Sequence, residues 1–294
     1  MRITGNTRLT GLFGYPVEHS VSPQMHNVAF GALGLDWCYV PFSVRPAELG
    51  DAVRGVRALG FVGVNVTIPH KEAVVGLVDE VDPTAALIGA VNTIRRVENR
   101  LLGYNTDAEG FMRSLRAAGF SPDGRRAAVL GAGGAAKAVT VALAQAGADR
   151  LDIVALEEEK DKAAALAALA GRASGGKTSG HANIWSHAAL REVAEQADIL
   201  VNATPIGMHP KSGVDPPVQE DWLREGMWVY DLVYHPRNTR LLEAAERRGC
   251  PAVSGVGMLV HQGGLSFQMW TGLEAPLDTM ERAVLEALGA ERAA

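Results

Sequence analysis

Two ionisable residues, Lys71 and Asp107, are of the types that transfer protons in enzymes. Pro69 ends a β-rich run, and Lys71 is expected near the start of the next helix, where the helix dipole disfavours an ammonium ion. Asp107 directly precedes another helical pattern. If the two meet in space, the carboxylate would orient an amine that passes a proton, as alcohol oxidation requires. The alternatives are a solvated lysine and an aspartate that only caps its helix.

The β-rich run before Lys71, FVGVNVTI, alternates between apolar and polar or small residues. Successive side chains of a strand point to opposite faces. The valines and Ile68 are therefore expected on one face, and Gly63, Asn65 and Thr67 on the other.

Two serines stand two residues apart in the segment HSVSPQMHN. Pro23 pushes the preceding residue toward an extended conformation, in which Ser20 and Ser22 point the same way. Their hydroxyls can then bind one anionic ligand, while Pro23 opens a helix that runs toward Gly34. The alternative is that Ser22 is the N-cap of that helix, a role worth about 1 kcal/mol. The two roles can coexist.

A glycine-rich turn lies between the strand AAVL and a helix. In GAGGAAKA, the residues Gly131, Gly133 and Ala136 have the GxGxxA spacing of dinucleotide-binding turns. Such a turn brings backbone N–H groups and a helix N-terminus against a pyrophosphate. A purely structural turn is the alternative. The candidate cofactor contacts are Gly131, Ala132, Gly133, Gly134 and Ala135.

Glu157 is expected at the end of the second strand of this βαβ unit, LDIVAL, about 20 residues beyond the turn. A carboxylate there accepts hydrogen bonds from the adenosine ribose and repels a 2′-phosphate. NAD is therefore favoured over NADP. Glu158 and Glu159 read as a solvated acidic run, and nearby lysines keep NADP open as an alternative.

Composition favours a soluble, cytoplasmic globular protein over several other classes. The chain has 294 residues, 47% of them hydrophobic, and a net charge of -5 without a dense Lys/Arg run, so a nucleic-acid partner is not expected. No segment has the length of a membrane span or a secretory signal. Cys38 and Cys250 lack the spacing of a metal site, and neither a metal nor a disulfide is expected.

Along the chain, short β-rich runs alternate with helical patterns over the first hundred residues, which predicts an α/β domain. A hairpin, VNTIRRV with LLGYNTD, follows. The glycine-rich turn begins a βαβ pattern whose parallel sheet is extended by DILVNAT and MWVYDLVY. GRASGGKTSG reads as a surface loop, and the C-terminal part is helical.

Eight sequence blocks together resemble the shikimate dehydrogenase family, in its order and over essentially the whole chain. They are GYPVEHSVSPQMHN, NVTIPHK, AVNT, GYNTDAEGF, GAGGAAKA, NATPIGM, DLVYHPRNTRLL and GMLVHQGG.

This resemblance implies roles for individual residues. It implies that Ser20 and Ser22 bind the substrate carboxylate and that Lys71 and Asp107 are the catalytic pair. The other substrate-binding residues implied are Asn65, Thr67, Asn92, Tyr234 and Gln262. The positions matched to the cofactor outside the turn are Ala203, Thr204, Met208, Gly255 and Met258.

The architecture expected is α/β, with an N-terminal substrate domain, a Rossmann-type doubly wound cofactor domain, and C-terminal helices that return to the first domain and close its cleft with Gln262. We expect the substrate domain to comprise residues 1–107 and 258–294, and the cofactor domain residues 108–257. The sequence does not decide the oligomeric state, and a homodimer stays open.

The function implied is that of a shikimate dehydrogenase of aromatic amino acid biosynthesis, which interconverts shikimate and 3-dehydroshikimate. NADP-dependent members usually carry Asn-Arg-Thr after the second cofactor strand, whereas this chain has ALEEEK, which resembles the NAD-using quinate/shikimate dehydrogenases. A dual quinate/shikimate enzyme is therefore the alternative, although the serine pair is typical of shikimate-specific members. A non-catalytic metabolite-binding regulator is the remote alternative.

Overall fold

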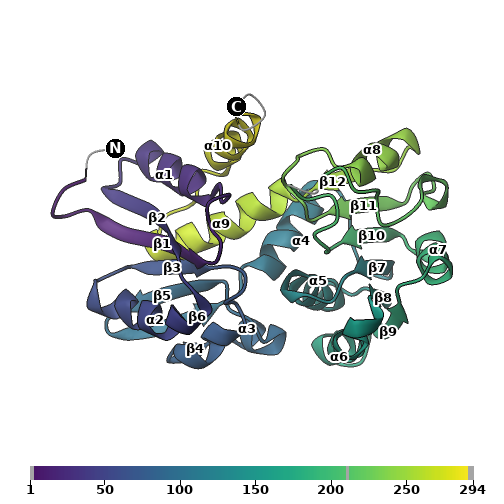
Figure 1. Cartoon of the computed structure of the whole chain (residues 1–294), viewed down its shortest axis with the longest axis horizontal. Coiled ribbons are helices and arrows are strands. Elements are labelled where there is room, and N and C mark those ends of the chain that lie inside the picture. Colours follow the sequence, from purple (N-terminus) through teal and green to yellow (C-terminus); the bar gives the residue numbers. More distant parts are fainter. Residues whose placement is uncertain (1–2, 210–211, 291–294) are drawn as a thin grey trace. The chain divides into compact units, whose positions relative to one another are not determined.

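The computed structural model describes residues 3–209 and 212–290. The chain divides into two compact units, the first with residues up to 110 and from 260 onward, the second with residues 111–259. The boundaries fall inside two helices, α4 (Asp107–Ala117) and α9 (Val256–Thr271). Each unit has its own six-stranded sheet (Figure 1).

The sheet of the first unit is mixed, with strand order β2-β1-β3-β5-β6-β4. β1 is parallel to both β2 and β3, and β5 is antiparallel to β3 and β6. The β5–β6 pair confirms the predicted hairpin, with Val97 opposite Arg100. The strands are β1 (Arg8–Gly14), β2 (Trp37–Ser43), β3 (Gly63–Val66), β4 (Glu80–Val81), β5 (Thr93–Val97) and β6 (Arg100–Tyr104).

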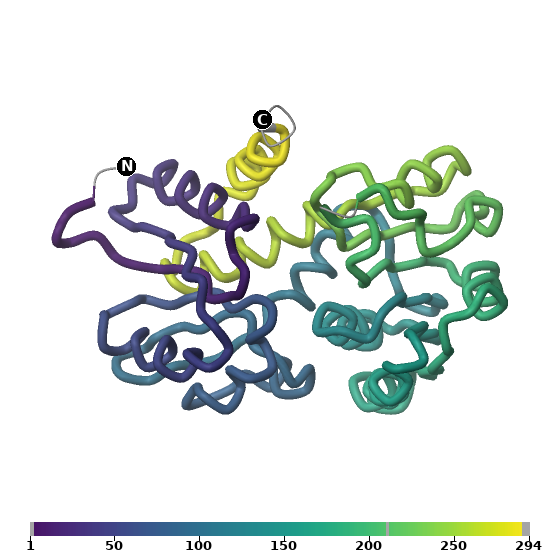
Figure 2. Tube along the Cα trace, in the orientation of Figure 1, coloured from purple at the N-terminus to yellow at the C-terminus, as the bar shows by residue number. Residues whose placement is uncertain are grey.

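Helices cover this sheet, and the C-terminal helix returns to it, as predicted. α10 packs against α1, so two helices that are far apart in the sequence lie side by side in this unit (Figure 2). Under α2, the apolar residues of β1, β3 and β5 form a core that includes Phe13, Val64 and Ile94. The helices are α1 (Ser22–Ala32), α2 (Leu49–Ala58), α3 (Pro83–Ile88) and α10 (Leu277–Ala290), with 3₁₀ helices η1 (Pro46–Glu48) and η2 (Ala73–Leu77).

The sheet of the second unit is wholly parallel, with strand order β12-β11-β10-β7-β8-β9. The chain reverses its direction of winding between β7 and β10, which confirms the predicted doubly wound fold. Ligands of such sheets bind at the carboxyl ends of the strands that flank this reversal. The strands are β7 (Arg126–Leu130), β8 (Arg150–Ala155), β9 (Ser179–Ile184), β10 (Ile199–Asn202), β11 (Trp228–Asp231) and β12 (Ala252–Ser254).

The prediction that the whole segment GRASGGKTSG is a surface loop is wrong. The helix before it continues to Ala173 and strand β9 begins at Ser179, so only a short turn separates them. β9 lies so close to α6 that a Cβ on Gly180 would be 2.0 Å from the carbonyl oxygen of Ala167. Gly180, which in the sequence indicates a loop, is therefore required by the packing of β9 against α6. The helices of this unit are α5 (Gly134–Gln145), α6 (Lys160–Ala173), α7 (His187–Gln196) and α8 (Arg240–Arg247), with η3 (Glu157–Glu159) and η4 (Glu220–Trp222).

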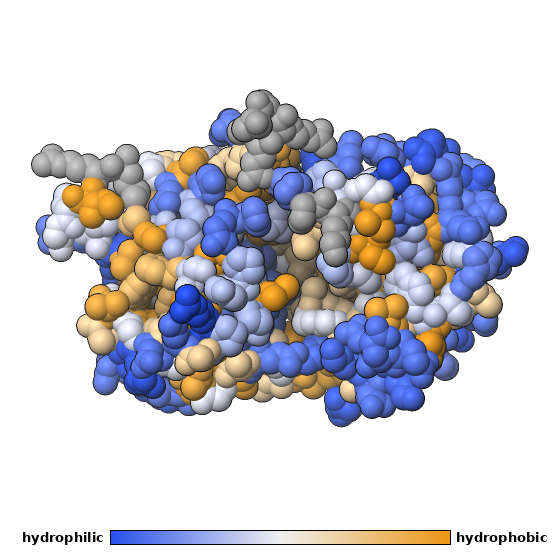
Figure 3. Space-filling view, viewed as in Figure 1, coloured by the Kyte–Doolittle hydropathy of each residue, from blue (hydrophilic) through white to orange (hydrophobic). Residues whose placement is uncertain are grey.

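The visible face over α6 is strongly hydrophilic (Figure 3). Cys38 and Cys250 are both buried thiols. In the described part of the chain, no helix combines the length and hydropathy of a membrane span. Over the same residues, no group of three or more His, Cys, Asp or Glu side chains is arranged to hold a metal ion.

His26, on α1, is a wholly buried titratable residue. Its ring stacks on that of Tyr39, with centroids 4.4 Å apart and planes inclined by 10°. Neither ring nitrogen has a hydrogen-bond partner among residues 3–209 and 212–290. Burial lowers the pKa of His26 to about 3, because the imidazolium ion would lose its hydration.

We predict that His26 makes folding sensitive to acid. Its pKa is lower in the folded chain than the 6.5 of an exposed histidine, so its contribution to stability is complete above that pH and is lost as the pH falls toward 3. Between pH 8 and pH 5 this loss should be about 2 kcal/mol. Urea unfolding at both pH values measures it. His26→Phe, which retains a stacking ring, should lose about 2 kcal/mol less than wild type between them; an equal loss would contradict the prediction.

Candidate active site

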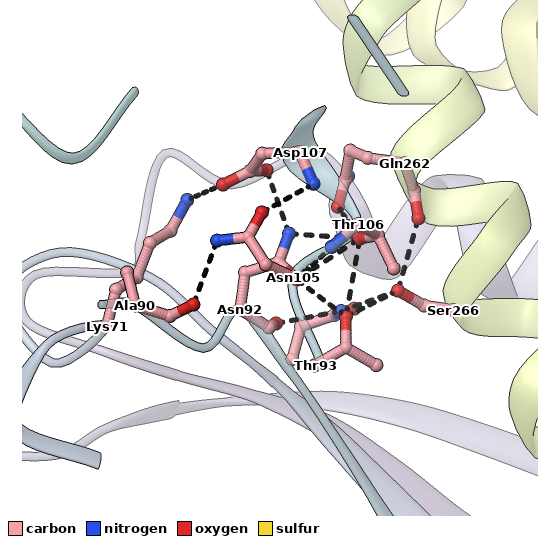
Figure 4. Close-up of polar contacts among 10 residues, drawn as sticks. Lys71, Ala90, Asn92, Thr93, Asn105, Thr106, Asp107, Gln262 and Ser266 are labelled. Carbon is pink, nitrogen blue, oxygen red and sulfur yellow. Dashed lines mark hydrogen bonds and ion pairs between the residues drawn. The ribbon is translucent and has the colours of Figure 1, made fainter. Parts of the chain in front are cut away.

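Lys71 and Asp107 form an ion pair that is largely buried. The Nζ atom of Lys71 lies 2.7 Å from Oδ2 of Asp107, and the two side chains are 22% and 8% exposed. The other carboxylate oxygen, Oδ1, accepts a hydrogen bond of 2.8 Å from Nδ2 of Asn92. Figure 4 shows the carboxylate between these two partners. Asp107 is the first residue of α4, and its oxygens bind side chains from other elements, beyond a simple capping role.

The helix expected after Pro69 is only the five-residue 3₁₀ helix η2, which begins two residues beyond Lys71. The helix-dipole effect predicted for Lys71 is therefore wrong, because so short a turn has no substantial macrodipole. Two buried contacts fix the turn instead. The carbonyl of Lys71 accepts a hydrogen bond of 2.8 Å from the N–H of Val91. The Nε2 of His70 lies 2.7 Å from the carbonyl oxygen of Val44.

The amide of Asn92 is fixed at both ends. Its Nδ2 donates to Asp107 and to the hydroxyl of Thr106, at 2.8 and 2.9 Å. Its Oδ1 accepts from the backbone N–H of Thr106 at 2.8 Å. Asn105, the residue before Thr106, accepts from the N–H of Asp107 and donates to the carbonyl of Ala90, both at 3.0 Å. These contacts determine the direction in which the Asp107 side chain points.

Asn65 lies in the same network and is only 6% exposed. Its Nδ2 donates to Thr93 and Ser266, each at 3.0 Å, and its Oδ1 accepts from the hydroxyl of Tyr39 at 2.9 Å. Ser266 is on α9, so this contact joins the sheet to the C-terminal helices. Both ends of the Asn65 amide thus bind protein groups.

β3 ends at Val66, whereas the predicted apolar face required a strand that continues to Ile68. Ile68 is 73% exposed, so its prediction as part of that face is wrong. Thr67 is partly exposed directly after the strand. Gly14, at the end of β1, allows this approach, because a Cβ there would lie 2.3 Å from the methyl group of Thr67.

Ser20 and Ser22 lie together at the start of α1, both partly exposed. The N–H of Ser22 donates to the hydroxyl oxygen of Ser20 at 3.3 Å. Ser22 is the first helical residue and Val21 is the N-cap, without a side-chain capping bond, so the N-cap interpretation of Ser22 is wrong. The two hydroxyls therefore stand together at a helix N-terminus, which favours an anionic ligand.

Gln262, on α9, lies beside the network, with its Oε1 accepting a 3.4 Å hydrogen bond from the hydroxyl of Thr106. α4 and α9 approach closely at this point. A Cβ on Gly110 would lie 2.7 Å from the Cβ of Gln262 and 2.8 Å from its backbone nitrogen. Only glycine permits this approach.

Sequence reasoning missed four residues that connect these groups. They are Thr93, Asn105, Thr106 and Ser266. The first three lie within the blocks AVNT and GYNTD, where polar residues at the ends of buried strands could have drawn attention. Ser266 had no comparable signal.

In the second unit, the glycine-rich turn has the geometry of an anion site. Gly131 has a φ of +101°, and a Cβ there would lie 3.1 Å from Thr204 and 3.2 Å from the carbonyl oxygen of Ala203. Gly133 is the N-cap of α5 and provides no side-chain cap, and space is open around Gly133 and Gly134. The first N–H groups of α5, including that of Ala135, can thus bind a pyrophosphate. Ala132 is buried within the turn.

Sequence reasoning also missed Asn202 and Asp231. They hold the loop after β10, which contains Thr204. Oδ1 of Asn202 accepts from the N–H and the hydroxyl of Thr204, at 3.1 and 2.6 Å, and its Nδ2 donates to Asp231 at 2.9 Å. Asp231 also accepts from the hydroxyl of Thr239 at 2.6 Å. Burial raises the pKa of Asp231, and these hydrogen bonds oppose that effect.

The remaining predicted residues of this unit lie on different elements. Met208 is 44% exposed in the loop after β10, and Tyr234 is partly buried in the loop after β11. Gly255 packs against the backbone of Leu232, where a Cβ would be 2.1 Å from a carbonyl oxygen. Met258 is buried on α9.

The prediction that Glu157 lies at the end of its strand is wrong. β8 ends at Ala155, and Glu157 is the first residue of η3. Its side chain is 66% exposed and forms a 3.3 Å ion pair with Lys160. The carboxylate is therefore more solvated than a strand-end position would make it.

A doubly wound sheet with a glycine-rich turn, together with a positioned lysine–carboxylate pair, is typical of dehydrogenases that act on hydroxyl groups. The family model "Shikimate dehydrogenase substrate binding domain" matches residues 12–94, and "Shikimate 5'-dehydrogenase C-terminal domain" matches residues 255–285. The chain is 48% identical to a shikimate dehydrogenase (NADP(+)) of Moorella thermoacetica, covering 99% of this chain and 97% of the relative. A shikimate dehydrogenase (NADP(+)) of Methanopyrus kandleri is 50% identical, covering 97% of this chain and 98% of the relative.

Solved structures agree. A shikimate dehydrogenase in complex with NADP+ has a TM-score of 0.90 at 39% identity, covering 98% of each chain. A Listeria monocytogenes shikimate 5-dehydrogenase in complex with shikimate and NAD has a TM-score of 0.86 at 39% identity, covering 96% of this chain and 98% of the other. A quinate dehydrogenase of Corynebacterium glutamicum in complex with NAD has a TM-score of 0.87 at 32% identity, covering 96% and 100%.

The chain belongs to the shikimate dehydrogenase family. It is accordingly an oxidoreductase that acts on a CH–OH group with a nicotinamide cofactor.

We predict that Gly110→Ala separates α4 from α9. The added methyl group would overlap Gln262, so the free energy of unfolding should fall by about 1–3 kcal/mol, as for other overpacked sites. Gly55→Ala in α2 is the matched control, because its Cβ would meet only a leucine methyl group at 3.9 Å. In urea unfolding, the control should be neutral or stabilised by up to about 1 kcal/mol. Equal stabilities of the two variants would show that the close approach is not required.

Proposed function

We propose that this enzyme interconverts shikimate and 3-dehydroshikimate, with Lys71 and Asp107 as the catalytic pair. The observation that carries the proposal is the Lys71–Asp107 ion pair, whose carboxylate is oriented on its other side by Asn92. The names of relatives that are 44–50% identical over nearly the whole chain support the substrate. In this proposal a substrate domain of residues 1–107 and 258–294 binds shikimate, and a domain of residues 108–257 binds the cofactor.

The geometry of the pair suits proton transfer at a hydroxyl group. An ammonium ion has three N–H donors, and in the described residues Lys71 uses one of them on Asp107, which leaves two for a substrate oxygen. During reduction the ammonium group of Lys71 would give one of these protons to the substrate oxygen. During oxidation the neutral amine of Lys71 would take the hydroxyl proton, and Asp107 would orient the group in both directions. When bound, the nicotinamide cofactor supplies the acceptor or donor of the hydride. Gly131–Ala135 and the start of α5 fit its pyrophosphate, with Ala203, Thr204, Met208, Gly255 and Met258 toward the nicotinamide end.

The substrate carboxylate would bind the hydroxyls of Ser20 and Ser22 at the N-terminus of α1. Thr67, Asn92, Tyr234 and Gln262 are the proposed ligands of the ring hydroxyls. We assign Asn65 to the same site, although its amide already binds protein groups at both ends. The alternative is an enzyme that also oxidises quinate. The similarity to a quinate dehydrogenase favours this alternative, whereas the serine pair favours shikimate alone.

For the cofactor, we propose a preference for NAD⁺ over NADP⁺. The three residues after β8 are Leu156, Glu157 and Glu158, so this loop presents a carboxylate and no arginine to a 2′-phosphate. The ion pair with Lys160 weakens the repulsion, and the names of several relatives specify NADP(+). The proposal therefore depends on the charge of Glu157.

We predict that Lys71→Ala lowers kcat for shikimate oxidation by about 100-fold or more, because the transferred proton loses its acceptor. The KM for shikimate should change little. Initial rates, followed through the absorbance of the reduced nicotinamide, measure both constants. Lys162→Ala is the control, since that lysine is exposed and forms an ion pair with Glu159 in the second unit. Unchanged turnover in Lys71→Ala would remove this lysine from the mechanism.

We also predict that Glu157→Ala reduces the preference for NAD⁺ by about fivefold or more, because a charge that repels the 2′-phosphate is removed. The quantity measured is the ratio of kcat/KM with NAD⁺ to kcat/KM with NADP⁺. Glu158→Ala removes an equal charge from the adjacent position and should alter this ratio less. If wild type prefers NADP⁺, or if the two variants give the same ratio, the role assigned to Glu157 is wrong.

A further inference from the structure

The peptide unit that joins Ala90 to Val91 is hydrogen-bonded on both sides. Its N–H, from Val91, donates to the carbonyl oxygen of Lys71 at 2.8 Å. Its carbonyl, from Ala90, accepts from Nδ2 of Asn105 at 3.0 Å (Figure 4). A trans peptide unit is planar, so its C=O and N–H groups point in opposite directions. The main chain at Lys71 therefore lies on one side of this unit and Asn105 on the other.

Asn105 connects this peptide unit with Asp107, two residues further along the chain. Its Oδ1 accepts from the backbone N–H of Asp107 at 3.0 Å. An asparagine side chain that binds the backbone two residues on forms an Asx turn. Here the turn fixes the main chain at the first residue of α4. A series of three hydrogen bonds thus joins the carbonyl of Lys71 to the N–H of Asp107.

The residues that make this connection are buried. Ala90 is 1% exposed, Val91 is 0% exposed and Asn105 is 8% exposed. A hydrogen bond between buried groups is costly to break, because each group would be left without a partner. The series therefore fixes the separation of the two main-chain segments that carry the ion pair. From these segments the Lys71 and Asp107 side chains meet at 2.7 Å.

A second asparagine, Asn92, acts on a different part of Asp107. Its Nδ2 donates to the carboxylate, whereas Asn105 accepts from the backbone N–H. Asn92 is also a proposed ligand of the substrate. The contacts that Asn105 makes with Ala90 and Asp107 are with main-chain groups, so a ligand bound to Asn92 leaves them in place.

We propose that Asn105 is a positioning residue for the reaction: through the Ala90–Val91 peptide unit, it holds the main chain of Asp107 at a fixed distance from that of Lys71. The amine is thereby presented to the substrate oxygen at one place. This matters because a displacement of about 1 Å at a reacting group can cost about 100-fold in rate. The inference rests on the proposed function, in which Lys71 and Asp107 are the catalytic pair. Asn105 itself acts through Asp107.

The direct test is Asn105→Ala, which removes both hydrogen bonds of the amide. We expect kcat for shikimate oxidation to fall about tenfold or more, with the KM for shikimate changed less than about threefold. Asn27→Ala is the matched control. The Asn27 side chain also binds backbone at both ends in the first unit, accepting from the N–H of Tyr39 at 2.8 Å and donating to its carbonyl at 2.9 Å. The control should lower the melting temperature similarly and leave kcat unchanged.

A purely structural role would give a different result. If Asn105→Ala lowers the melting temperature as the control does but keeps kcat within about twofold of wild type, the proposal is overturned. A double-mutant cycle adds a stricter requirement. In the Asp107→Ala background, Asn105→Ala should lower kcat by no more than about twofold, because the group that it positions is gone. Equal effects in both backgrounds would contradict the proposal.

A second variant, Asn105→Ser, keeps the test decisive if Asn105→Ala does not fold. A serine can still accept from the N–H two residues on, but it has no amide to donate and its side chain is too short to bridge to Ala90 as well. The turn should therefore be kept while the connection to Lys71 is lost, and kcat should stay well below that of wild type. A wild-type kcat in Asn105→Ser would overturn the proposal.

The same measurements separate this inference from the proposed function. If wild type does not oxidise shikimate, or if Asp107→Ala keeps the full rate, the proposed function or its catalytic pair fails. If wild type is active and Asp107→Ala is slow, while both Asn105 variants turn over normally, only the role of Asn105 is refuted.

Discussion

The geometry of the candidate active site depends on the Asp107 carboxylate, which is bound on both oxygens. Lys71 takes one oxygen at 2.7 Å and Asn92 the other at 2.8 Å, so neither the carboxylate nor the ammonium can turn without breaking a charge-assisted hydrogen bond. The elements around the pair are arranged to keep this geometry. The hairpin β5–β6 carries Asn92 to the start of α4, and Gly110 allows α9 to pack where Gln262 reaches the network.

The two units use the same device. In the first, Asn92 and Asp107 are hydrogen-bonded in a network of buried side chains. In the second, buried Asp231 accepts from Asn202, whose Oδ1 holds Thr204 beside the glycine-rich turn. Buried polar groups are costly when unpaired, and a fully paired network therefore stabilises one arrangement of the chain over its alternatives. Such networks give functional loops the rigidity of the sheets that carry them.

Local patterns predicted the parts of the fold and site that depend on neighbouring residues. The glycine-rich turn and the hairpin each carried a recognisable spacing. The helix context predicted for Lys71 is wrong, whereas the blocks NVTIPHK and GYNTDAEGF, which contain Lys71 and Asp107, resemble those of the family. Strand β9 was missed because its glycine and polar residues read as a loop, although Gly180 is required by the contact with α6. The orientation of Asn65 was beyond sequence reasoning, because its partner Ser266 is 201 residues away along the chain.

A double-mutant cycle on kcat for shikimate oxidation, with Lys71→Ala, Asp107→Ala and the combined variant, tests the central claim that the carboxylate acts through the amine it holds. If so, Asp107→Ala should slow wild type strongly but slow Lys71→Ala by no more than a few fold, since residues that act as a unit are not additive. Multiplicative effects in the combined variant would mean that Lys71 and Asp107 contribute independently, and would contradict the account.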